Sequence, residues 1–369
     1  MAMSFEDYVN AYYGGTLGIS KRYGISKADD PYETTDPAGA FNVMYGASVF
    51  NQLNTKSEVF KLIKKEGWER SGWRVLTARG TTTAGVAEGA AFPETDKMDM
   101  TEISATIKEI VTPFEVTTKA ELLSEADDGI KGLASFLRKE QAEAHAFYID
   151  QQLLGTGDVV AGNDFESLDR IAMSDAAANA TFSARADIDI YTTIDRSAAS
   201  WADATVSHNS GTDRALTLAM LDTIIEGALD NGVNYSDLII LTGYDTYNNL
   251  KQLLQSGTQT MFRAPLGDTP GANLNGVAGE GGVDFDTRVG AYDGIPIFLS
   301  QHVVADTTSR LFLLDMGNLA LRIAAPTTFV SNDNLSITQK MSKEHAFITS
   351  GELIAYKFNT HGSIRDLNA

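Results

Sequence analysis

The segment from Gly67 to Met100 constrains the fold of this chain most, because its middle cannot bury itself. Strand-forming residues from Trp68 to Thr83 precede the small-residue stretch Ala84–Glu94, and strand-like alternation resumes around Ile103. Two strands joined in this way are only marginally stable by themselves in water. We therefore expect a long two-stranded loop that projects from the body of the protein and gains stability by lying on a neighbouring copy of the chain.

Length and composition indicate a folded protein of more than one domain. At 369 residues the chain exceeds the usual size of one hydrophobic core, and its 43% hydrophobic content is ordinary for a globular protein. No apolar run approaches the roughly 18 residues that a membrane span requires. The first residues, Met1 to Ser20, are polar and aromatic and lack a cationic stretch, which argues against a secretory signal and favours synthesis and assembly in the cytoplasm.

The charge balance is strongly acidic, with 49 acidic and 29 basic residues and a formal net charge of −20. Affinity for nucleic-acid phosphates depends on clustered Lys and Arg, so this balance argues against direct or sequence-specific binding of DNA. The acidity is compatible with a solubility device, with a surface that faces cations, or with halophilic adaptation to concentrated salt, where the Debye length shortens to about 3 Å at 1 M. Many such copies repel one another at low ionic strength, so we expect salt or loosely bound cations at acidic patches to stabilise an assembly.

Residues 1–56 form an N-terminal segment that cannot close a core of its own. Glycines cluster near its start, and the turn-forming pairs Asp30-Pro31 and Asp36-Pro37 follow. The segment is nevertheless richer in aromatic residues than a free solvated tail. These residues are Tyr8, Tyr12, Tyr13, Tyr23, Tyr32, Phe41 and Tyr45. We expect an extended arm that lies on another surface, with a flexible terminus as the alternative.

Two helices are predicted next along the chain. The first is a short amphipathic helix from Ser57 to about Gly67. For the second, Asp127 or Asp128 is placed to cap a helix over residues 129–154 that stops at Gly155. At 1.5 Å per residue this helix is a rod of roughly 39 Å. Its predicted buried face consists of Ile130, Leu133, Leu137, Ala144 and Tyr148.

Helices and strands alternate from Leu216 to Ile323, which is typical of a compact α/β domain. The predicted helices are 217–232 and 244–255, and the predicted strands are 237–242, 295–300, 310–314 and 319–323. Eight glycines between Gly267 and Gly294 predict a mobile surface loop. Two long strands, 329–340 and 346–359, are predicted to return the chain to the domain of the long helix.

The sequence lacks the motifs of an enzyme or a cofactor-binding protein. It has no cysteine, which excludes disulfides, thiolate metal sites and cysteine nucleophiles. The glycines of 267–294 have no lysine for a phosphate loop, and no Gly-x-Ser-x-Gly motif occurs. Asp284 and Asp286 suggest a calcium loop, but Val289 and Ile295 stand where that loop needs glycine and glutamate. None of the histidines is paired at metal-ligand spacing: His145, His208, His302, His345 and His361. We predict no catalytic site, cofactor or metal site.

Three groups of motifs carry a resemblance to a known family. Val86–Pro93 looks like a glutamate-glycine loop segment, and Asp150–Gly155 looks like the end of a spine helix with its acidic residue before a terminal glycine. The third group is Leu241–Leu250, Asp293–Ile297 and Leu313–Leu319. In this order and spacing they resemble the major capsid proteins of tailed double-stranded DNA viruses, both phages and archaeal tailed viruses. The resemblance runs from about Ser57 to the end of the chain and implies an α+β fold of the Hong Kong 97 type.

The resemblance also implies an organisation. It assigns an N-terminal arm to 1–56, a short helix to 57–66, an extended loop to 67–100, a peripheral domain with the spine helix to 101–157, an α/β axial domain to 158–325 and return strands of the peripheral domain to 326–369. In the family the axial domains meet at five-fold and six-fold centres, and the extended loop rests on the adjacent subunit. The candidate assembly contacts are Trp73, Arg79, Glu88, Phe92, Glu94, Tyr12, Tyr13, Tyr23 and Phe41.

The implied function is self-assembly, as hexamers and pentamers, into the icosahedral shell of a virion that encloses double-stranded DNA. Expected partners are a portal, decoration proteins and a separate scaffolding protein, because the chain opens at the arm where some relatives carry a scaffolding domain. Lys97 is the only lysine between Gly67 and Met100 and lies near the loop base, so we expect none of the covalent cross-links that some relatives form. The alternatives are an encapsulin-type compartment shell of the same fold and a soluble α/β enzyme with a glycine-rich lid.

Overall fold

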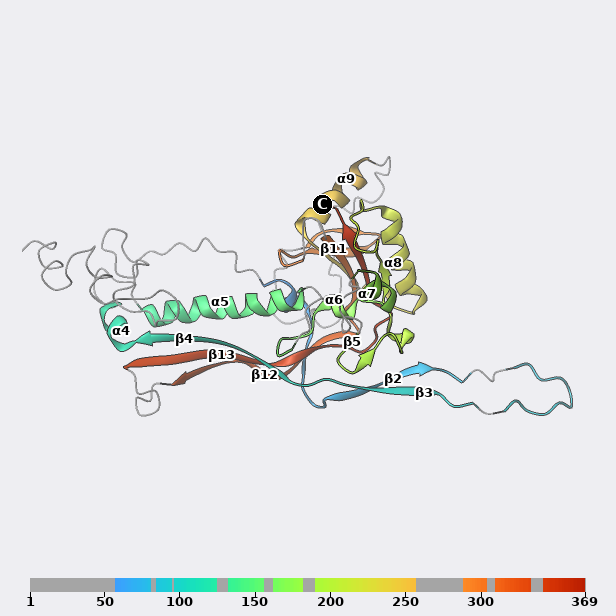
Figure 1. Cartoon of the computed structure of the whole chain (residues 1–369), viewed down its shortest axis with the longest axis horizontal. Helices are drawn as coiled ribbons and strands as arrows, with labels where there is room; N and C mark the ends of the chain where they lie inside the picture. The colour runs from blue at the N-terminus through green and yellow to red at the C-terminus, as the bar shows by residue number, and fades with distance from the viewer. Residues whose placement is uncertain are drawn as a thin grey trace, which may run out of the picture. The chain divides into compact units, whose positions relative to one another are not determined.

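The computed structural model describes residues 57–80, 84–94, 96–124, 132–155, 162–181, 190–256, 288–303, 309–332 and 341–368. The described residues fall into two compact units. The first unit is drawn from 111–147 and 327–349, and the second from 57–110, 148–326 and 350–369. Both helices and strands occur along the described chain (Figure 1), which agrees with the α+β class predicted from the sequence.

A four-stranded sheet has the order β1-β12-β13-β4. Its strands are β1 (Lys65–Gly67), β12 (Leu319–Asn332), β13 (Ser342–Ala355) and β4 (Lys108–Thr117). The separate strands predicted at 319–323 and 329–340 were wrong, because 319–332 is one continuous strand. β1 pairs only with residues 321–323 of β12, so Pro326 lies beyond this pairing and its missing amide donor interrupts no bond to β1.

A six-stranded sheet has the order β7-β14-β11-β8-β10-β9. Its strands are β7 (Thr205–Ser207), β14 (Gly362–Leu367), β11 (Ser309–Asp315), β8 (Leu238–Thr242), β10 (Ile295–Leu299) and β9 (Arg288–Tyr292). The central strands predicted from their apolar runs are confirmed. Three strands of this sheet were not predicted: 288–292 was assigned to a loop, and no strand was predicted for 205–207 or 362–367.

The six-stranded sheet is buried on both faces. Along β8, Leu238 and Ile240 belong to one hydrophobic cluster, and Ile239 and Leu241 belong to another. The first cluster includes the inner side of helix α8 (Leu218–Asp230), which ends before Gly232 at φ +78° as predicted, although the Thr217 side chain does not bond to the helix start. Helix α9 (Tyr244–Ser256) follows β8 and buries Leu250. A strand covered on both sides reads as a continuous apolar run, as Leu-Ile-Ile-Leu does here.

The long predicted helix is α5 (Leu133–Leu153), but its buried face differs from the prediction. Leu133 and Leu137 are buried, whereas Ala144 is exposed and Tyr148 is 44% exposed. Toward its end the helix buries His145, Ile149 and Leu153 instead. At 3.6 residues per turn, the direction of a side chain turns by about 160° between Leu133 and Ile149. The prediction assumed that one face is buried along the whole helix, but the two ends of α5 bury different faces. Three residues of the predicted helix and its cap lie outside the described residues: Ile130, Asp127 and Asp128.

Helix α3 (Val59–Leu62) is a single turn, shorter than the helix predicted for 57–67, because β1 begins at Lys65. Its start is held by Asp150 of α5. The Phe60 amide donates to Asp150 Oδ1 at 2.7 Å, and the Asp150 side chain is fully buried. A carboxylate is a favourable acceptor at a helix start, so the acidic residue before Gly155 supports α3 by a contact distant in sequence.

The remaining elements are short. They are α4 (Thr118–Ser124), α6 (Leu168–Ile171), α7 (Asp175–Thr181), β5 (Ile190–Tyr191), β6 (Ile194–Asp195) and the 3-10 turns Ser200–Ala202 and Tyr235–Asp237. The predicted glycine-rich lid is represented only from residue 288 onward, since 257–287 lie outside the described residues.

Candidate functional site

β2 (Gly72–Ala78) and β3 (Asp99–Ser104) form the antiparallel ribbon predicted from the sequence (Figure 1). Alternate residues face opposite ways along each strand. On the inner face, Trp73 lies opposite Ile103, which is only 1% exposed, and Trp73 and Val75 pack against the main hydrophobic cluster of the second unit. One face of the ribbon is therefore committed to the chain's own core.

The outer face of the ribbon is exposed and mixes charged with apolar residues. Leu76 and Met100 are opposite one another and are 46% and 62% exposed. Beside them, Arg74 Nη2 and Glu102 Oε1 form an ion pair at 2.7 Å with both side chains more than two-thirds exposed. Exposed ion pairs contribute only about 0–1 kcal/mol, so this pair adds little to the stability of the ribbon. The outer face is suited to contact another molecule.

Beyond the strands, every residue from Ala84 to Glu94 is exposed. Phe92 is the extreme case at 93%, and Met98, on the way back to β3, is 61% exposed. Burial of a Phe or Met side chain contributes roughly 1.5–3 kcal/mol, which these residues do not gain within the chain. Exposed apolar groups gathered in this way mark an interaction surface.

The structure separates the predicted contact residues into groups. Arg79, Glu88, Phe92 and Glu94 are all exposed. Trp73 instead faces the core of its own chain, with its ring 6.3 Å from the ring of Tyr356. Tyr12, Tyr13, Tyr23 and Phe41 lie outside the described residues.

Sequence reasoning missed Leu76, Met98 and Met100 on the outer face. The signal was available for two of them. Once Trp73 is assigned to the inner face, Leu76 has the opposite parity on the same strand, and Met100 has the opposite parity to Ile103 on the other.

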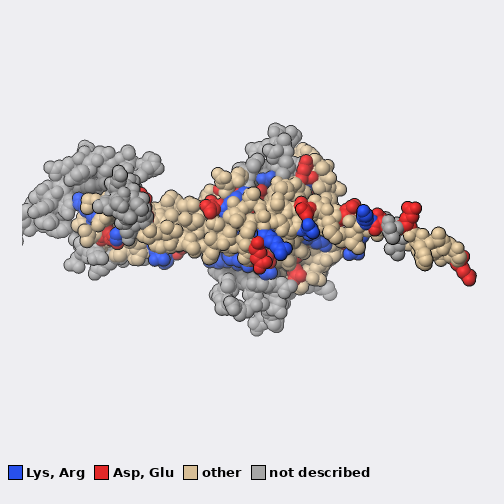
Figure 2. Space-filling view, turned by 90° about the horizontal axis from the view of Figure 1, so that it is seen from below, with Lys and Arg blue, Asp and Glu red and all other residues tan. Residues whose placement is uncertain are grey.

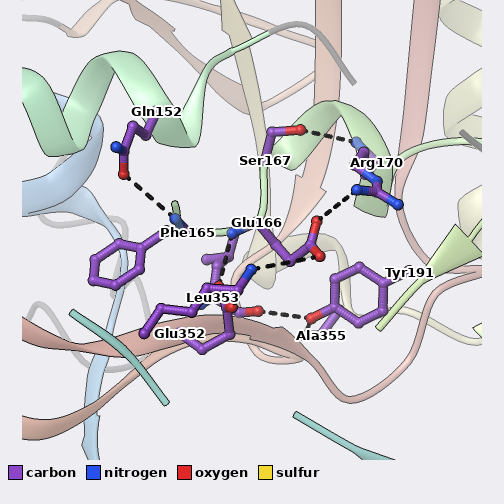
Figure 3. A network of polar contacts seen from close by, with 10 residues as sticks. Gln152, Phe165, Glu166, Ser167, Arg170, Tyr191, Glu352, Leu353 and Ala355 are labelled. Carbon is purple, nitrogen blue, oxygen red and sulfur yellow. Dashed lines mark hydrogen bonds and ion pairs between the residues drawn. The ribbon is translucent and has the colours of Figure 1, made fainter. Parts of the chain in front are cut away.

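Four buried charged groups of the second unit form a network (Figure 3). Lys108 Nζ lies 2.7 Å from Glu352 and 3.7 Å from Glu166, and Glu166 also pairs with Arg170 at 3.4 Å. Glu352 Oε1 accepts from the amides of Glu166 and Leu353 at 2.7 and 2.9 Å. Because the two carboxylates and two cations balance in charge and contact each other, this network joins β4, β13 and the start of α6 as a structural element.

Burial perturbs the acids in these contacts. It raises the pKa of Glu352 to about 7, against the opposing effect of the Lys108 ammonium. Burial likewise raises the pKa of Asp150 to about 6, against the amide hydrogen bonds of α3. Strongly shifted pKa values occur in structural ion networks as well as in catalytic sites. Here each shifted carboxylate bonds to backbone amides of its own chain, which is a structural role.

A second buried cluster surrounds Asp169, whose side chain is 0% exposed. Arg365 donates to Asp169 Oδ1 at 2.5 Å, and Arg310 bonds to Oδ2. This pairing explains why Gly362–Leu367, with its polar sequence, is buried throughout: its arginine is neutralised by an acid from α6.

Within the described ranges, no group of three or more His, Asp or Glu residues is placed to hold a metal ion. Among the helices of those same ranges, none has the length and apolar character to cross a membrane. On the face seen in Figure 2, Lys and Arg are interspersed with Asp and Glu, and uncharged residues make up most of the surface.

The model of the family described as SU10 major capsid protein matches residues 130–368 of the sequence. This chain belongs to that family. The capsid protein is therefore a structural component of a virion and not an enzyme, and proteins of this class carry no cofactor. No curated protein sequence shows significant similarity to it.

Solved structures share the fold of the capsid protein at low sequence identity. The capsid asymmetric unit of cyanophage A-1(L) superposes with a TM-score of 0.63 and 16% identity, covering 88% of this chain and 96% of that one. The capsid of the native GTA particle gives 0.56 and 11%, covering 93% and 100%. Mycobacterium phage Bobi gives 0.54 and 9%, covering 88% and 95%. The predicted Hong Kong 97-like fold and capsid function are confirmed.

Proposed function

We propose that copies of the capsid protein hold one another in the shell through the exposed ribbon and its tip. The observation that carries this proposal is the exposed run Ala84–Glu94, in which the Phe92 ring is 93% exposed. The apolar side chains of the tip and outer face contribute stability only when an adjacent copy covers them. The ribbon then acts as a strap between neighbours.

The contact residues have distinct roles in this proposal. Phe92, Leu76 and Met100 supply apolar contact area, and Arg79, Glu88 and Glu94 form a polar rim around it. Trp73 anchors the ribbon to its own subunit instead of touching the neighbour, which its position against the core supports. The aromatic residues of the 1–56 arm, among them Tyr12, Tyr13, Tyr23 and Phe41, add further contacts between copies.

The parts of the chain then have the roles that the resemblance to tailed-virus capsid proteins implies. Residues 67–100 are the extended loop, 101–157 and the strands after 326 form a peripheral domain around α5, and 158–325 form an axial domain at five-fold and six-fold centres. One amendment concerns 362–367. Because β14 pairs with β11 and β7, we assign these residues to the axial domain.

The proposed partners follow from the role in a virion. The capsid protein forms hexamers and pentamers, assembles on a separate scaffolding protein, and meets a portal and decoration proteins in the finished particle. It encloses double-stranded DNA without reading its sequence, which the excess of 49 acidic over 29 basic residues supports. Nuclease-protected DNA in purified particles is the expected finding, and particles that hold only protein cargo would favour a compartment shell.

Deletion of Gly80 to Phe92 tests the ribbon proposal. The shortened chain is expected to fold and to remain as free subunits or capsomers, because the deleted residues contribute little to the core. Electron microscopy scores closed shells, and circular dichroism scores folding. Closed, stable shells from the deletion variant would refute the proposal, and an unfolded variant would show that the segment belongs to the core.

A further inference from the structure

Arg322 lies where the ribbon leaves the four-stranded sheet. It is on β12, opposite Glu66 in the parallel pairing of β12 with β1, and its side chain is half-buried. A backbone hydrogen bond continues the pairing of β1 with β12 by one residue: the Trp68 amide donates to the Ile323 carbonyl at 3.0 Å. The residues between this bond and Gly72, where β2 begins, are the only covalent link from β1 into the ribbon.

The Arg322 guanidinium contacts the ribbon directly. Its Nη1 donates to the Arg70 carbonyl at 2.8 Å, and its centre lies 5.6 Å from the Trp73 ring. A cation over an indole face contributes about 0.5–2 kcal/mol, depending on how far it is desolvated. A single side chain thus holds both the backbone before β2 and the first inward-facing ring of β2.

The other side of the guanidinium is fixed by Tyr356, just after β13. Arg322 Nε and Nη2 donate to the Tyr356 hydroxyl at 3.3 and 3.1 Å, and the guanidinium lies 5.3 Å from the Tyr356 ring. The Trp73 and Tyr356 rings meet edge to face at 77°. The Arg322 guanidinium therefore contacts both Trp73 of the ribbon and Tyr356, the residue that follows β13.

Glu66 of β1 completes the arrangement. The Tyr356 hydroxyl donates to Glu66 Oε2, and Lys64 Nζ lies 3.0 Å from Glu66 Oε1. Burial acts to raise the pKa of Glu66, but the hydrogen bonds from Tyr356 and Lys64, together with the charges of Lys64 and Arg322, outweigh it, so the pKa lies below its ordinary value. Glu66, Tyr356 and Arg322 form one chain of contacts from β1 through β13 to the ribbon.

We propose that Arg322 is the positioning residue of the ribbon: it fixes the direction in which β2 and β3 leave their subunit, and so places the tip for contact with the next copy. Arginine suits this role because its planar fork donates in several directions and stacks on rings at the same time, whereas lysine supplies one compact charge. The importance of the placement for assembly rests on the proposed function of the ribbon, but the placement itself does not.

The placement is measured without assembly. The chain has no cysteine, so spin labels are attached at two exposed sites introduced by Ala78→Cys, at the end of β2, and Glu226→Cys, on α8. Pulsed dipolar spectroscopy of unassembled full-length subunits then gives the distribution of ribbon-to-body distances. We expect a narrow distribution in the parent, a clearly broader one in Arg322→Ala, and an intermediate one in Arg322→Lys.

Two outcomes overturn the proposal: an unchanged distance distribution in Arg322→Ala, or one fully restored by lysine. If Arg322→Ala fails to fold, Tyr356→Phe is measured instead, because it removes only the hydroxyl that accepts two of the guanidinium hydrogen bonds. An unchanged distance distribution in Tyr356→Phe would also overturn the proposal. Stability in urea is recorded in parallel, so that broadening without a shift of the unfolding midpoint identifies positioning and not general loosening.

The same variants separate this inference from the proposed function. Shell formation by Arg322→Ala is expected to fall while the subunit stays folded. If the Gly80–Phe92 deletion still forms shells but Arg322→Ala broadens the distribution, the ribbon proposal fails and the positioning role stands. If the deletion blocks shells and Arg322→Ala changes neither distance nor assembly, the positioning role fails alone.

Discussion

The six-stranded sheet and the ribbon are both made of β-strands, yet they obtain their stability from different sources. In the sheet, every residue of β8, β10, β11 and β14 is buried. In the ribbon, β2 alternates between exposed and half-buried residues along its whole length. A subunit needs the first kind of strand to fold by itself. The second kind leaves apolar surface that a neighbour can bury, since apolar surface already buried within the chain gains nothing from association.

The largest expected effect is in the sheet. Leu313→Ala removes a fully buried side chain at the centre of β11 and is expected to lower the free energy of unfolding by about 2–5 kcal/mol. Urea denaturation measures the loss. Leu229→Ala, at a partly exposed side chain of α8, is the matched control, with an expected loss of about 1 kcal/mol. Similar losses in both variants would contradict the contrast.

Phe92→Ser makes the complementary test at the ribbon tip. Subunit stability is expected to stay within about 0.5 kcal/mol of the parent, because Phe92 is 93% exposed in the single chain. The protein concentration needed for assembly is expected to rise by roughly 10- to 100-fold, because each interface between copies forgoes the roughly 1.5–3 kcal/mol that burial of the ring contributes. Light scattering measures assembly.

The control for Phe92 is Leu122→Ser, at a side chain that is 70% exposed on α4. An equal loss of assembly in both variants would show that exposed apolar area in general, and not the ribbon tip, drives association.

Glu352→Gln tests whether the buried network acts within the subunit. Burial raises the pKa of Glu352 from 4.5 to about 7. The resulting contribution to the free energy of unfolding is fully present below the pKa of the unfolded chain, and it is lost as pH rises through about 7. The parent should therefore lose about 1–3 kcal/mol more stability than Glu352→Gln between about pH 5 and pH 8.

Denaturation curves across this pH range supply the comparison for Glu352. Glu69→Gln, an exposed acid near the start of the ribbon, serves as the control and should keep the pH dependence of the parent. If the free energies of unfolding of the parent and Glu352→Gln vary with pH in parallel, Glu352 is not the source of the pH dependence.

The smallest expected effect is at the ion pair on the outer face of the ribbon. Arg74→Ala should change subunit stability by less than about 1 kcal/mol, since Arg74 and Glu102 are 72% and 71% exposed. A double-mutant cycle with Glu102→Ala isolates the pair. A coupling well above this value would mean that the ribbon stabilises itself more than its exposure suggests.

Much of the fold could be predicted because local pattern and tertiary environment agree. The apolar run 238–242 gave a buried strand, and Thr217 and Gly232 correctly bounded α8. The ribbon was predictable for the opposite reason, because small residues from Ala84 onward could form no core.

The failures lie where distant contacts override local pattern. β14 reads as polar, and only the pairing of Arg365 with Asp169, 196 residues away, makes it a buried strand. The turning buried face of α5 depends on what lies beside each end of the helix, which periodicity alone does not contain. Trp73 packs against the core of its own chain, which local pattern could not indicate because its partners, Arg322 and Tyr356, follow it by about 250 residues or more.

The position of β14 within its sheet has a consequence for synthesis. The strand is placed between β7 and β11, yet it follows both in chain order. On the ribosome the ribbon emerges early, while the sheet keeps a gap between β7 and β11 until residues 362–367 are released. A nascent or truncated chain without residues 362–367 thus has the ribbon but lacks the strand that pairs with both β7 and β11, so its six-stranded sheet is incomplete.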